Sequence, residues 1–328
     1  MPKLKIGIIG YRNHSKKLIA LFNNHHSVRE IISYCYKKEK IENLNKLNTE
    51  KKVFYTSKLK SLYNCDSIVI SSSTGTHIKY LKKFIRKKKN IFCEKPGPIN
   101  INDVNYLKNL PFRLKKNIFF GQNLIFSDLF YSLKKILKKK IYGTPIYSTI
   151  TITNGISFKR SMINNWRFNS KSVFKKITGN VGIHYIGLMS SLFGSIKKMK
   201  IEENGTQKKN KTDNSFIDLD FSNKLKCKIY LSYSTVVEEE LRIFLTNAQL
   251  VFDGKRINIY HPRDTFGKNG NFIKPPKKIL KRFNASWSDD SLKNTVGNFL
   301  KKCLSKKNFN LKEYNNFLKL NEFLIKNK

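Results

Sequence analysis

The start of the chain is the feature that most constrains the fold. Residues 4–10 (LKIGIIG) form a short apolar run that ends in a glycine. Residues 15–24 carry apolar side chains at helical spacing, and residues 30–36 (EIISYCY) form a second strand candidate. A strand, a glycine turn, a helix and a second strand make a βαβ unit with parallel strands. The pattern therefore predicts a chain that begins as a parallel α/β domain.

The same alternation of strands and helices continues up to Gln122. Further strand candidates are residues 53–55, 67–72, 90–93 and 117–121, and helix-like stretches are residues 76–88 and 101–110. Strands that are apolar on both faces are typical of a parallel sheet covered by helices on both sides. We expect a Rossmann-type, doubly wound parallel sheet in a first domain, residues 1–122.

Beyond residue 122 the pattern changes to closely spaced strands, which are typical of antiparallel hairpins. A helical stretch at residues 127–139 precedes strand candidates at residues 144–153, 215–221, 225–234, 240–246, 249–253 and 255–260. Residues 261–276 have the composition of a loop, and helical segments at residues 291–304 and 311–326 close the chain. Because 328 residues exceed one ordinary core, we expect a second, α+β domain, residues 123–328, with an open, largely antiparallel sheet.

The chain is strongly basic, with a net charge of +43. Clustered Lys and Arg would indicate a nucleic acid or an anionic membrane as partner. Here the lysines recur from end to end, together with an excess of Asn and Ile, which is typical of an AT-rich genome. We therefore expect no specific nucleic-acid partner, although the charge would help to attract an anionic small molecule.

The cysteines and the apolar runs indicate the compartment. The five cysteines are scattered and lack the Cys-x-x-Cys spacing of zinc sites or redox pairs. We expect reduced, buried thiols and no metal. No stretch of about 18 uncharged apolar residues occurs, and the N-terminus lacks the profile of a signal peptide. These features predict a cytoplasmic protein without a membrane partner.

Gly10 lies at the first strand-to-helix turn, where a dinucleotide fold brings its backbone close to a pyrophosphate. If Gly10 is the first glycine of G-x-G-x-x-G, Arg12 and Ser15 replace the other two. The guanidinium of Arg12 would then contact a phosphate instead. An ordinary turn is the alternative. The cofactor-binding candidates in this loop are Gly10, Tyr11, Arg12 and Asn13.

The end of the second strand lacks the acidic residue that binds the ribose hydroxyls of NAD, and Tyr36, Lys37 and Lys38 stand there instead. A basic pair beside the ribose would accept a 2′-phosphate, which favours NADP over NAD. The alternative is that both lysines belong to the general lysine excess. Tyr36 and Lys37 are therefore further cofactor-binding candidates.

The most distinctive segment is FCEKP, residues 92–96, which follows a strand at the edge of the sheet where ligands bind. It resembles the Glu-Lys-Pro signature of the Gfo/Idh/MocA oxidoreductases, the family of glucose-fructose oxidoreductase and inositol dehydrogenase. The segment SSTGTH, residues 72–77, is similar to the family's preceding loop, with Ser73 in place of the usual proline. GNVGIH, residues 179–184, resembles the motif of its second domain. The resemblance runs in order along nearly the whole chain.

The resemblance implies a dehydrogenase with NAD or NADP as cofactor, acting on a sugar-type substrate such as a sugar, a nucleotide sugar or a cyclitol. It implies that Lys95 points at the hydride-transfer site, often after a cis peptide bond to Pro96. The further cofactor-binding candidates that it adds are Ser72, Ser73, Thr74, His77, Glu94, Lys95 and Gln122.

Oxidising a secondary alcohol requires departure of a hydride and loss of the hydroxyl proton. The ammonium of Lys95 would stabilise the developing alkoxide, and His184 would exchange the proton. A structural role is the alternative for His184. Trp166 and Arg167 are substrate-binding candidates, because an Arg can hold a carboxylate or phosphate with two hydrogen bonds.

The chain also departs from the family pattern. Asn180 stands where the family has an aspartate four residues before its histidine, so we count it as a catalytic and substrate-binding candidate without a charge. The missing carboxylates and glycines favour an alternative, a non-catalytic relative that binds a dinucleotide or sugar as a sensor. Because one face of an open sheet lacks helices, we also expect a homodimer or homotetramer.

Overall fold

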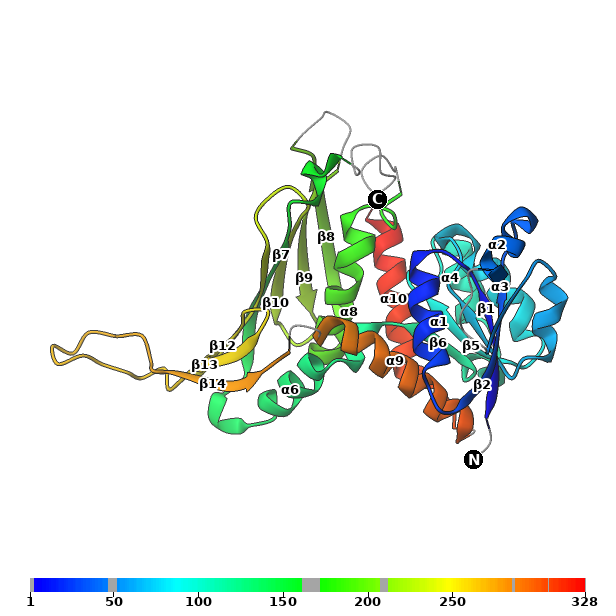
Figure 1. The fold of residues 1–328 in the computed structure, drawn as a ribbon. Helices are drawn as coiled ribbons and strands as arrows, with labels where there is room; N and C mark the ends of the chain where they lie inside the picture. Colours follow the sequence, from blue (N-terminus) through cyan, green and yellow to red (C-terminus); the bar gives the residue numbers. More distant parts are fainter. Residues whose placement is uncertain are drawn as a thin grey trace. The chain divides into compact units, whose positions relative to one another are not determined.

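The computed structural model describes residues 3–46, 52–160, 172–206, 212–284, 287–305 and 307–327. The chain divides into two compact units (Figure 1). The first consists of Met1–Phe126 and Ser291–Glu322, and the second of Ser127–Asp290 and Phe323–Lys328.

The first unit contains a six-stranded sheet in the order β3-β2-β1-β4-β5-β6, with all neighbouring strands parallel. The strands are β1 (Leu4–Ile9), β2 (Val28–Tyr34), β3 (Val53–Thr56), β4 (Ser67–Ile70), β5 (Asn90–Glu94) and β6 (Ile118–Gly121). The strand order reverses between β1 and β4, which is the switch point where such sheets bind ligands. The predicted Rossmann-type sheet is confirmed.

Helices connect these strands and bury apolar faces against the sheet. The helices are α1 (Asn13–Asn23), α2 (Ile41–Lys46), α3 (His77–Ile85), α4 (Ile101–Lys108) and α5 (Phe112–Lys115), with short 3-10 turns η1 (Lys38–Lys40), η2 (Leu59–Asn64), η3 (Thr74–Thr76) and η4 (Asn123–Phe126). In α1 the buried residues Leu18, Ile19 and Phe22 repeat at helical spacing, so one face meets the core. The side chain of Asn100 caps α4 by accepting the N–H of Asp103.

The last two helices, α9 (Trp287–Leu304) and α10 (Leu311–Lys326), pack onto the first unit, α9 within its main core cluster and α10 through Phe317, which stacks on Phe120 of β6. Phe299 of α9 is fully buried, and its ring lies 6.2 Å from that of Phe22 of α1 and 5.5 Å from that of Phe92 of β5. This division differs from the single boundary at residue 122 that the sequence suggested. The physical reason is that the apolar face of α9 packs onto aromatic residues near the start of the chain.

The second unit contains an eight-stranded sheet in the order β14-β13-β12-β11-β7-β10-β9-β8. Its strands are β7 (Pro145–Thr153), β8 (Ile196–Asn204), β9 (Asn214–Phe221), β10 (Lys226–Ser232), β11 (Glu238–Leu245), β12 (Ala248–Phe252), β13 (Arg256–Tyr260) and β14 (Lys277–Arg282). Neighbours are antiparallel except β7 and β10, which are parallel. The predicted, largely antiparallel sheet is confirmed, and β8 and β14 are additional strands.

Helix α8 (Ile183–Phe193) covers one face of this sheet (Figure 1). The described helices of this unit also include α6 (Asp128–Leu137) and the short turns η5 (Lys140–Tyr142) and η6 (Ile156–Phe158), and a π-helix, Thr178–Gly182, leads directly into α8. Gly182 fits closely against this face, because an added Cβ would lie 2.9 Å from Leu231 and 3.2 Å from Ile217. The opposite face carries the stacked rings of Phe216 and Tyr230.

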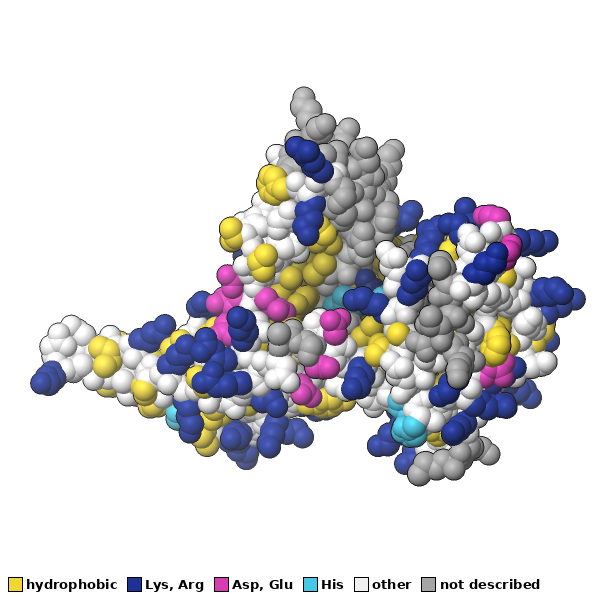
Figure 2. Space-filling view, viewed as in Figure 1, with side chains coloured by type: hydrophobic (Ala, Val, Ile, Leu, Met, Phe, Trp, Pro, Cys, Tyr) yellow, Lys and Arg dark blue, Asp and Glu magenta, His cyan; other side chains and the backbone are white. Residues whose placement is uncertain are grey.

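The surface is basic without one dominant basic region on the face that Figure 2 shows, where Lys and Arg side chains are spread over both units. Among the described residues, no helix combines the length and apolar character needed to cross a membrane. All five cysteines are buried and unbridged, as expected. Burial raises the pKa of the Cys65 thiol to about 11 and that of Cys227 to about 12, so neither is a reactive thiolate.

Candidate active site

The loop after β1 lies at the carboxyl end of the central strand of the first unit. Gly10 adopts a φ of +142°, and an added Cβ would lie 2.3 Å from Ser15 Oγ and 2.8 Å from Ser71 O. Only glycine fits there. Arg12, the residue before α1, makes no side-chain hydrogen bond to the first turn of the helix. The first backbone N–H groups of α1, beginning at Asn13, are therefore not capped by that residue, which suits an anion.

Tyr11, Arg12 and Tyr36 form a small cluster beside the end of β2. The rings of Tyr11 and Tyr36 are 6.0 Å apart, and Arg12 Nη2 donates to Tyr36 Oη at 3.4 Å. Tyr36 is 57% exposed. Lys37 Nζ lies 3.8 Å from Glu39 Oε1, so the predicted basic pair is partly neutralised by a nearby carboxylate.

The loop after β4 forms the short turn η3 and begins α3. Ser72 Oγ and Thr76 Oγ1 are 2.7 Å apart, and Thr76 Oγ1 donates to the backbone carbonyl of Ser73 at 2.8 Å. Thr74 is the first residue of η3. His77 is 3% exposed, its Nε2 lies 2.9 Å from Ser72 O, and burial lowers its pKa. A neutral imidazole therefore supports this loop.

Glu94 and Lys95 follow at the end of β5. Glu94 is 5% exposed, and its Oε2 accepts the backbone N–H of Lys95 at 3.2 Å. The positive charge of Lys95 favours the ionised form of Glu94 and opposes protonation of His14 and His77. The peptide bond between Lys95 and Pro96 is cis. The structure thus brings residues from the ends of three strands together at one edge of the sheet.

His14 is the residue that sequence reasoning missed. It lies in the first turn of α1, and its Nε2 is 3.1 Å from Glu94 Oε1. The negative charge of Glu94 raises the pKa of His14. Burial alone would raise the pKa of Glu94, but the positive charges of His14 and Lys95 and the hydrogen bond from His14 outweigh it and lower that pKa. No sequence motif marked this pair.

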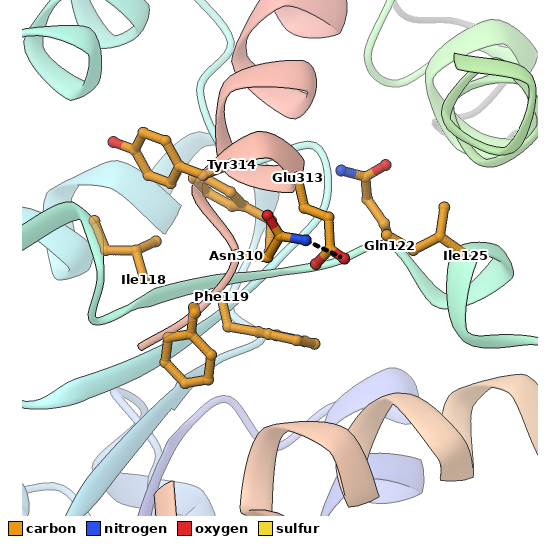
Figure 3. Close-up of a pocket in the computed structure, with 9 residues that line it drawn as sticks. Ile118, Phe119, Gln122, Ile125, Asn310, Glu313 and Tyr314 are labelled. Atoms are coloured by element: carbon orange, nitrogen blue, oxygen red, sulfur yellow. Dashed lines mark hydrogen bonds between the residues drawn. The ribbon is translucent and has the colours of Figure 1, made fainter. Parts of the chain in front are cut away.

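Gln122 lies directly after β6, next to Gly121, which pairs with Glu94 in the sheet register. The buried side chain of Gln122 lines a small hollow with Asn310, Glu313 and other residues, and Asn310 Nδ2 donates to Glu313 Oε1 at 3.0 Å (Figure 3). The structure therefore associates Gln122 with α10 and the end of β6. Its contact with a cofactor stays a prediction.

In the second unit, Asn180 lies in the π-helix and His184 one turn later in α8. Both side chains are partly buried. Gly179 anchors this turn, because an added Cβ would lie 2.3 Å from Phe174 Cα. π-Helical turns often occur at functional sites. Trp166 and Arg167 lie outside the described residues.

The described residues contain no group of three or more His, Cys, Asp or Glu side chains arranged to hold a metal ion. The candidate site is therefore a set of backbone N–H groups, hydroxyls, one ion pair and a lysine at the carboxyl edge of a parallel sheet. Such an edge accepts a dinucleotide whose pyrophosphate meets the N-terminus of the first helix.

Two family models match the chain. Residues 4–121 match the model described as an oxidoreductase family with an NAD-binding Rossmann fold, and residues 130–251 match the C-terminal domain of the same GFO/IDH/MocA group. Together these ranges span more than half of the chain.

Single proteins that resemble the chain share only part of its sequence. A myo-inositol 2-dehydrogenase of Thermotoga maritima is 32% identical over 27% of this chain and 26% of its own length. A glucose-6-phosphate 3-dehydrogenase of Bacillus subtilis is 24% identical over 70% of this chain and 67% of its own. The crystal structure of an Agrobacterium radiobacter oxidoreductase in complex with NAD⁺, L-tartaric acid and magnesium has a TM-score of 0.76 at 15% identity, covering 98% of this chain and 94% of that one. By its two matching domains, in the family's order, the chain belongs to the Gfo/Idh/MocA family of oxidoreductases, with an NAD-binding Rossmann fold at its N-terminus.

Proposed function

We propose that this protein is an NAD(P)-dependent dehydrogenase that transfers a hydride between the nicotinamide and a secondary alcohol or ketone of a sugar, a nucleotide sugar or a cyclitol. The observation that carries the proposal is the position of Lys95. It follows β5, next to the edge strand of a Rossmann-type sheet, and its backbone N–H is held by Glu94, whose other carboxylate oxygen lies 3.1 Å from Nε2 of His14 in the loop and first helical turn after β1. The relatives named for a cyclitol and a sugar phosphate indicate the substrate class.

The residues of the first unit fit a dinucleotide. The backbone of Gly10 leaves a close space beside Ser15 and Ser71 that a Cβ on any other residue would fill. The first turn of α1 offers backbone N–H groups that Arg12 does not cap, and the helix dipole adds partial positive charge there. We assign Gly10, Tyr11 and Asn13 to the pyrophosphate side, Arg12 to the adenosine ribose side, and Glu94 and Lys95 to the nicotinamide side.

When bound, the nicotinamide supplies the hydride acceptor or donor. Lys95 would donate a hydrogen bond to the reacting oxygen and stabilise negative charge that develops on it. His184 would take or give the hydroxyl proton, and Asn180 would orient that hydroxyl through its amide. Glu94 holds the backbone of Lys95 and thereby its direction.

For the cofactor we favour NADP over NAD. The exposed phenol of Tyr36 and the guanidinium of Arg12 lie side by side at the end of β2, where no Asp or Glu immediately follows the strand. A guanidinium binds a 2′-phosphate well, because it donates hydrogen bonds to the phosphate oxygens. Lys37 contributes less, because Glu39 lies 3.8 Å from its ammonium. Comparing the Kd of NADPH with that of NADH, for the wild type and for Arg12→Ala, tests this preference.

The decisive experiment replaces Lys95 with Met, a side chain of similar length without charge. Wild type and variant would be assayed with NAD⁺ and NADP⁺ on myo-inositol, glucose 6-phosphate and a nucleotide sugar. We expect kcat to fall by roughly 10²–10³-fold while dinucleotide binding persists. The exposed Lys79→Met on α3 serves as the matched control. Undiminished turnover in Lys95→Met would refute its assigned role.

The alternative of a non-catalytic sensor makes a different prediction for the same assay. It requires that the wild type binds dinucleotide but turns over no substrate on a broad sugar panel. Restoring the family carboxylate with Asn180→Asp would then also leave the protein inactive. Turnover of any substrate by the wild type would exclude this alternative.

We also propose a homo-oligomer built on the face of the second unit's sheet that α8 does not cover. This face carries two aromatic pairs, Phe216 with Tyr230 at 5.0 Å and Tyr147 with Phe244 at 5.7 Å between ring centroids. Phe216 is 44% exposed. An exposed aromatic surface of this kind is typical of an interface.

A further inference from the structure

Glu94 is a buried carboxylate at the edge where we propose that the dinucleotide binds. Its side chain is 7% exposed, and a buried charge of this kind is costly unless it is paired. It lies in a crowded position, since a Cβ added to Gly121 of β6 would meet Glu94 Oε1 at 3.0 Å. Unpaired, it would place a negative charge close to the site of an anionic pyrophosphate.

His14 is the side chain that compensates this charge. It belongs to the turn of α1 whose N–H groups face the proposed pyrophosphate site, and its Nε2 lies 3.1 Å from Glu94 Oε1. The other carboxylate oxygen of Glu94 accepts the backbone N–H of Lys95. One carboxylate thus joins the dinucleotide loop after β1 to the lysine after β5.

We propose that His14 is a positioning residue that neutralises Glu94 and ties the dinucleotide loop to the strand end that carries Lys95. The proposal rests on the function proposed above, because it assumes that a dinucleotide binds this edge. His14 would then make the affinity for the cofactor depend on pH. Neither residues 92–96 nor residues 10–13 contain a histidine that could do so.

The groups around the pair define the pH range. Glu94 raises the pKa of His14, while the positive charges of Lys95 and Lys17 oppose that shift without cancelling it. The pKa of Glu94 is lowered, so Glu94 stays ionised above its usual pKa of 4.5. Burial lowers the pKa of His77 and raises that of the Cys93 thiol, so both of these further neighbours are neutral near pH 7. Protonation in the neutral range therefore falls on His14.

The direction in which dinucleotide affinity changes with pH follows from these pKa shifts. Because the folded pKa of His14 is raised, the charged pair is complete below the ordinary histidine pKa of 6.5 and is lost as the pH rises through the raised value. Above that value Glu94 keeps its charge and loses its cationic partner. Dinucleotide affinity should therefore weaken as the pH rises from 6 to 9.

The test measures the Kd of NADH by fluorescence at pH 6 and at pH 9, without substrate. NADH is chosen because it lacks the 2′-phosphate, which itself titrates in this range. We expect the Kd of the wild type to rise roughly tenfold over this interval, because the loss of one ionic partner changes binding by about this factor. His14→Gln keeps an N–H donor but does not titrate, so its Kd should change little with pH. His14→Ala should bind weakly at both pH values.

Two further variants distinguish a positioning role of His14 from a general loss of folding or of dinucleotide binding. Glu94→Gln removes the charge that His14 compensates, so it should also abolish the pH dependence, and an NMR titration should place its His14 pKa nearer the ordinary value. His26→Gln changes another exposed histidine and should behave as the wild type. Thermal unfolding of each variant checks that the fold is retained.

The outcomes distinguish this inference from the proposed function. A wild type that binds NADH with the same Kd at both pH values, together with His14→Ala of equal affinity, would overturn the role of His14 and leave that of Lys95 standing. A wild type that binds neither NADH nor NADPH would overturn both proposals. Loss of the pH dependence in His14→Gln and Glu94→Gln, with the control unchanged, would support the inference.

Discussion

The hydroxyl of Ser15 donates a hydrogen bond to the backbone carbonyl of Ser71 at 3.1 Å and accepts one from Ser71 Oγ at 2.9 Å. Ser15 stands where a dinucleotide motif would have its third glycine, which normally lets helix and strand pack closely. Here the missing Cβ of Gly10 leaves the room that Ser15 Oγ occupies. The hydrogen bonds therefore join α1 to the end of β4.

Replacing Ser15 with Ala should lower the free energy of unfolding by about 1 kcal/mol, because the carbonyl of Ser71 loses this donor in a partly buried position. Urea denaturation followed by circular dichroism measures the change. Lys16→Ala, an exposed neighbour on the same helix, is the control. A Ser15→Ala variant as stable as the wild type would mean that the hydroxyl contributes no net stability.

Replacing Gly10 with Ala should be more severe. Its φ of +142° is unfavourable for any other residue, and the new Cβ would clash with Ser15 and with the backbone of Ser71. We expect a loss of about 1–3 kcal/mol from the strained backbone and weaker NADPH binding. Gly75→Ala is the control for stability, because an added Cβ there meets no atom within 4 Å. Equal stability of the two variants would contradict the close fit of Gly10 against Ser15 and Ser71.

Much of the first unit could be predicted from its strands. Segments such as Ser67–Ile70 are buried on both faces, and that continuous apolar run is visible in the sequence. β8 and β14 were missed because charged residues dominate them, Lys and Glu in β8 and Lys and Arg in β14, and too few apolar residues mark their alternation. These two strands are held in the sheet by pairing with β9 and β13, and the local sequence pattern carries no information about such pairing.

The candidate site was partly predictable for a similar reason. Glu94 and Lys95 stand in a short motif, so their position after β5 could be recognised. His14 had no such signal, because its partner Glu94 is distant in the sequence and only the parallel order of β1, β4 and β5 brings them together. The helical pattern of α9 likewise revealed an apolar face without revealing what covers it.

Because α9 completes the core of the first unit, Phe299→Ala should destabilise that unit by about 3–5 kcal/mol, the usual cost of removing a buried aromatic ring. Phe299 contacts the rings of Phe22, Phe92, Phe119 and Phe309. Dinucleotide binding should be lost at a lower urea concentration than in the wild type. The exposed Phe112→Ala should change neither quantity. A small effect at Phe299 would argue against this assignment of α9.

The proposed oligomer can be tested at Phe216, whose ring stacks on Tyr230 on the uncovered face of the second unit's sheet. Phe216→Lys places a charge in that face and should shift the protein toward its monomer mass of 38.4 kDa in light scattering. Phe112→Lys on the first unit is the matched control. A wild type that is already monomeric would refute the interface.

The last prediction concerns a partly buried acid in the second unit. Tyr185 of α8 donates to Glu239 Oε1 of β11 at 3.1 Å, and burial raises the pKa of Glu239 although hydrogen bonds from Tyr185 and Trp287 oppose it. A carboxyl group with a raised folded pKa favours the folded state most below its usual pKa of 4.5, and this contribution is lost as the pH rises through the raised value.

Glu239→Gln keeps an acceptor for Tyr185 but carries no charge at any pH. It should therefore be more stable than the wild type at pH 8, and the difference should shrink toward zero at pH 4, where Glu239 is largely protonated. Urea denaturation at both pH values measures this difference. The exposed Glu238→Gln should show no such pH-dependent gain. A Glu239→Gln variant that is less stable than the wild type at pH 8 would mean that the ionised carboxylate is favourable there, contrary to the effect of burial.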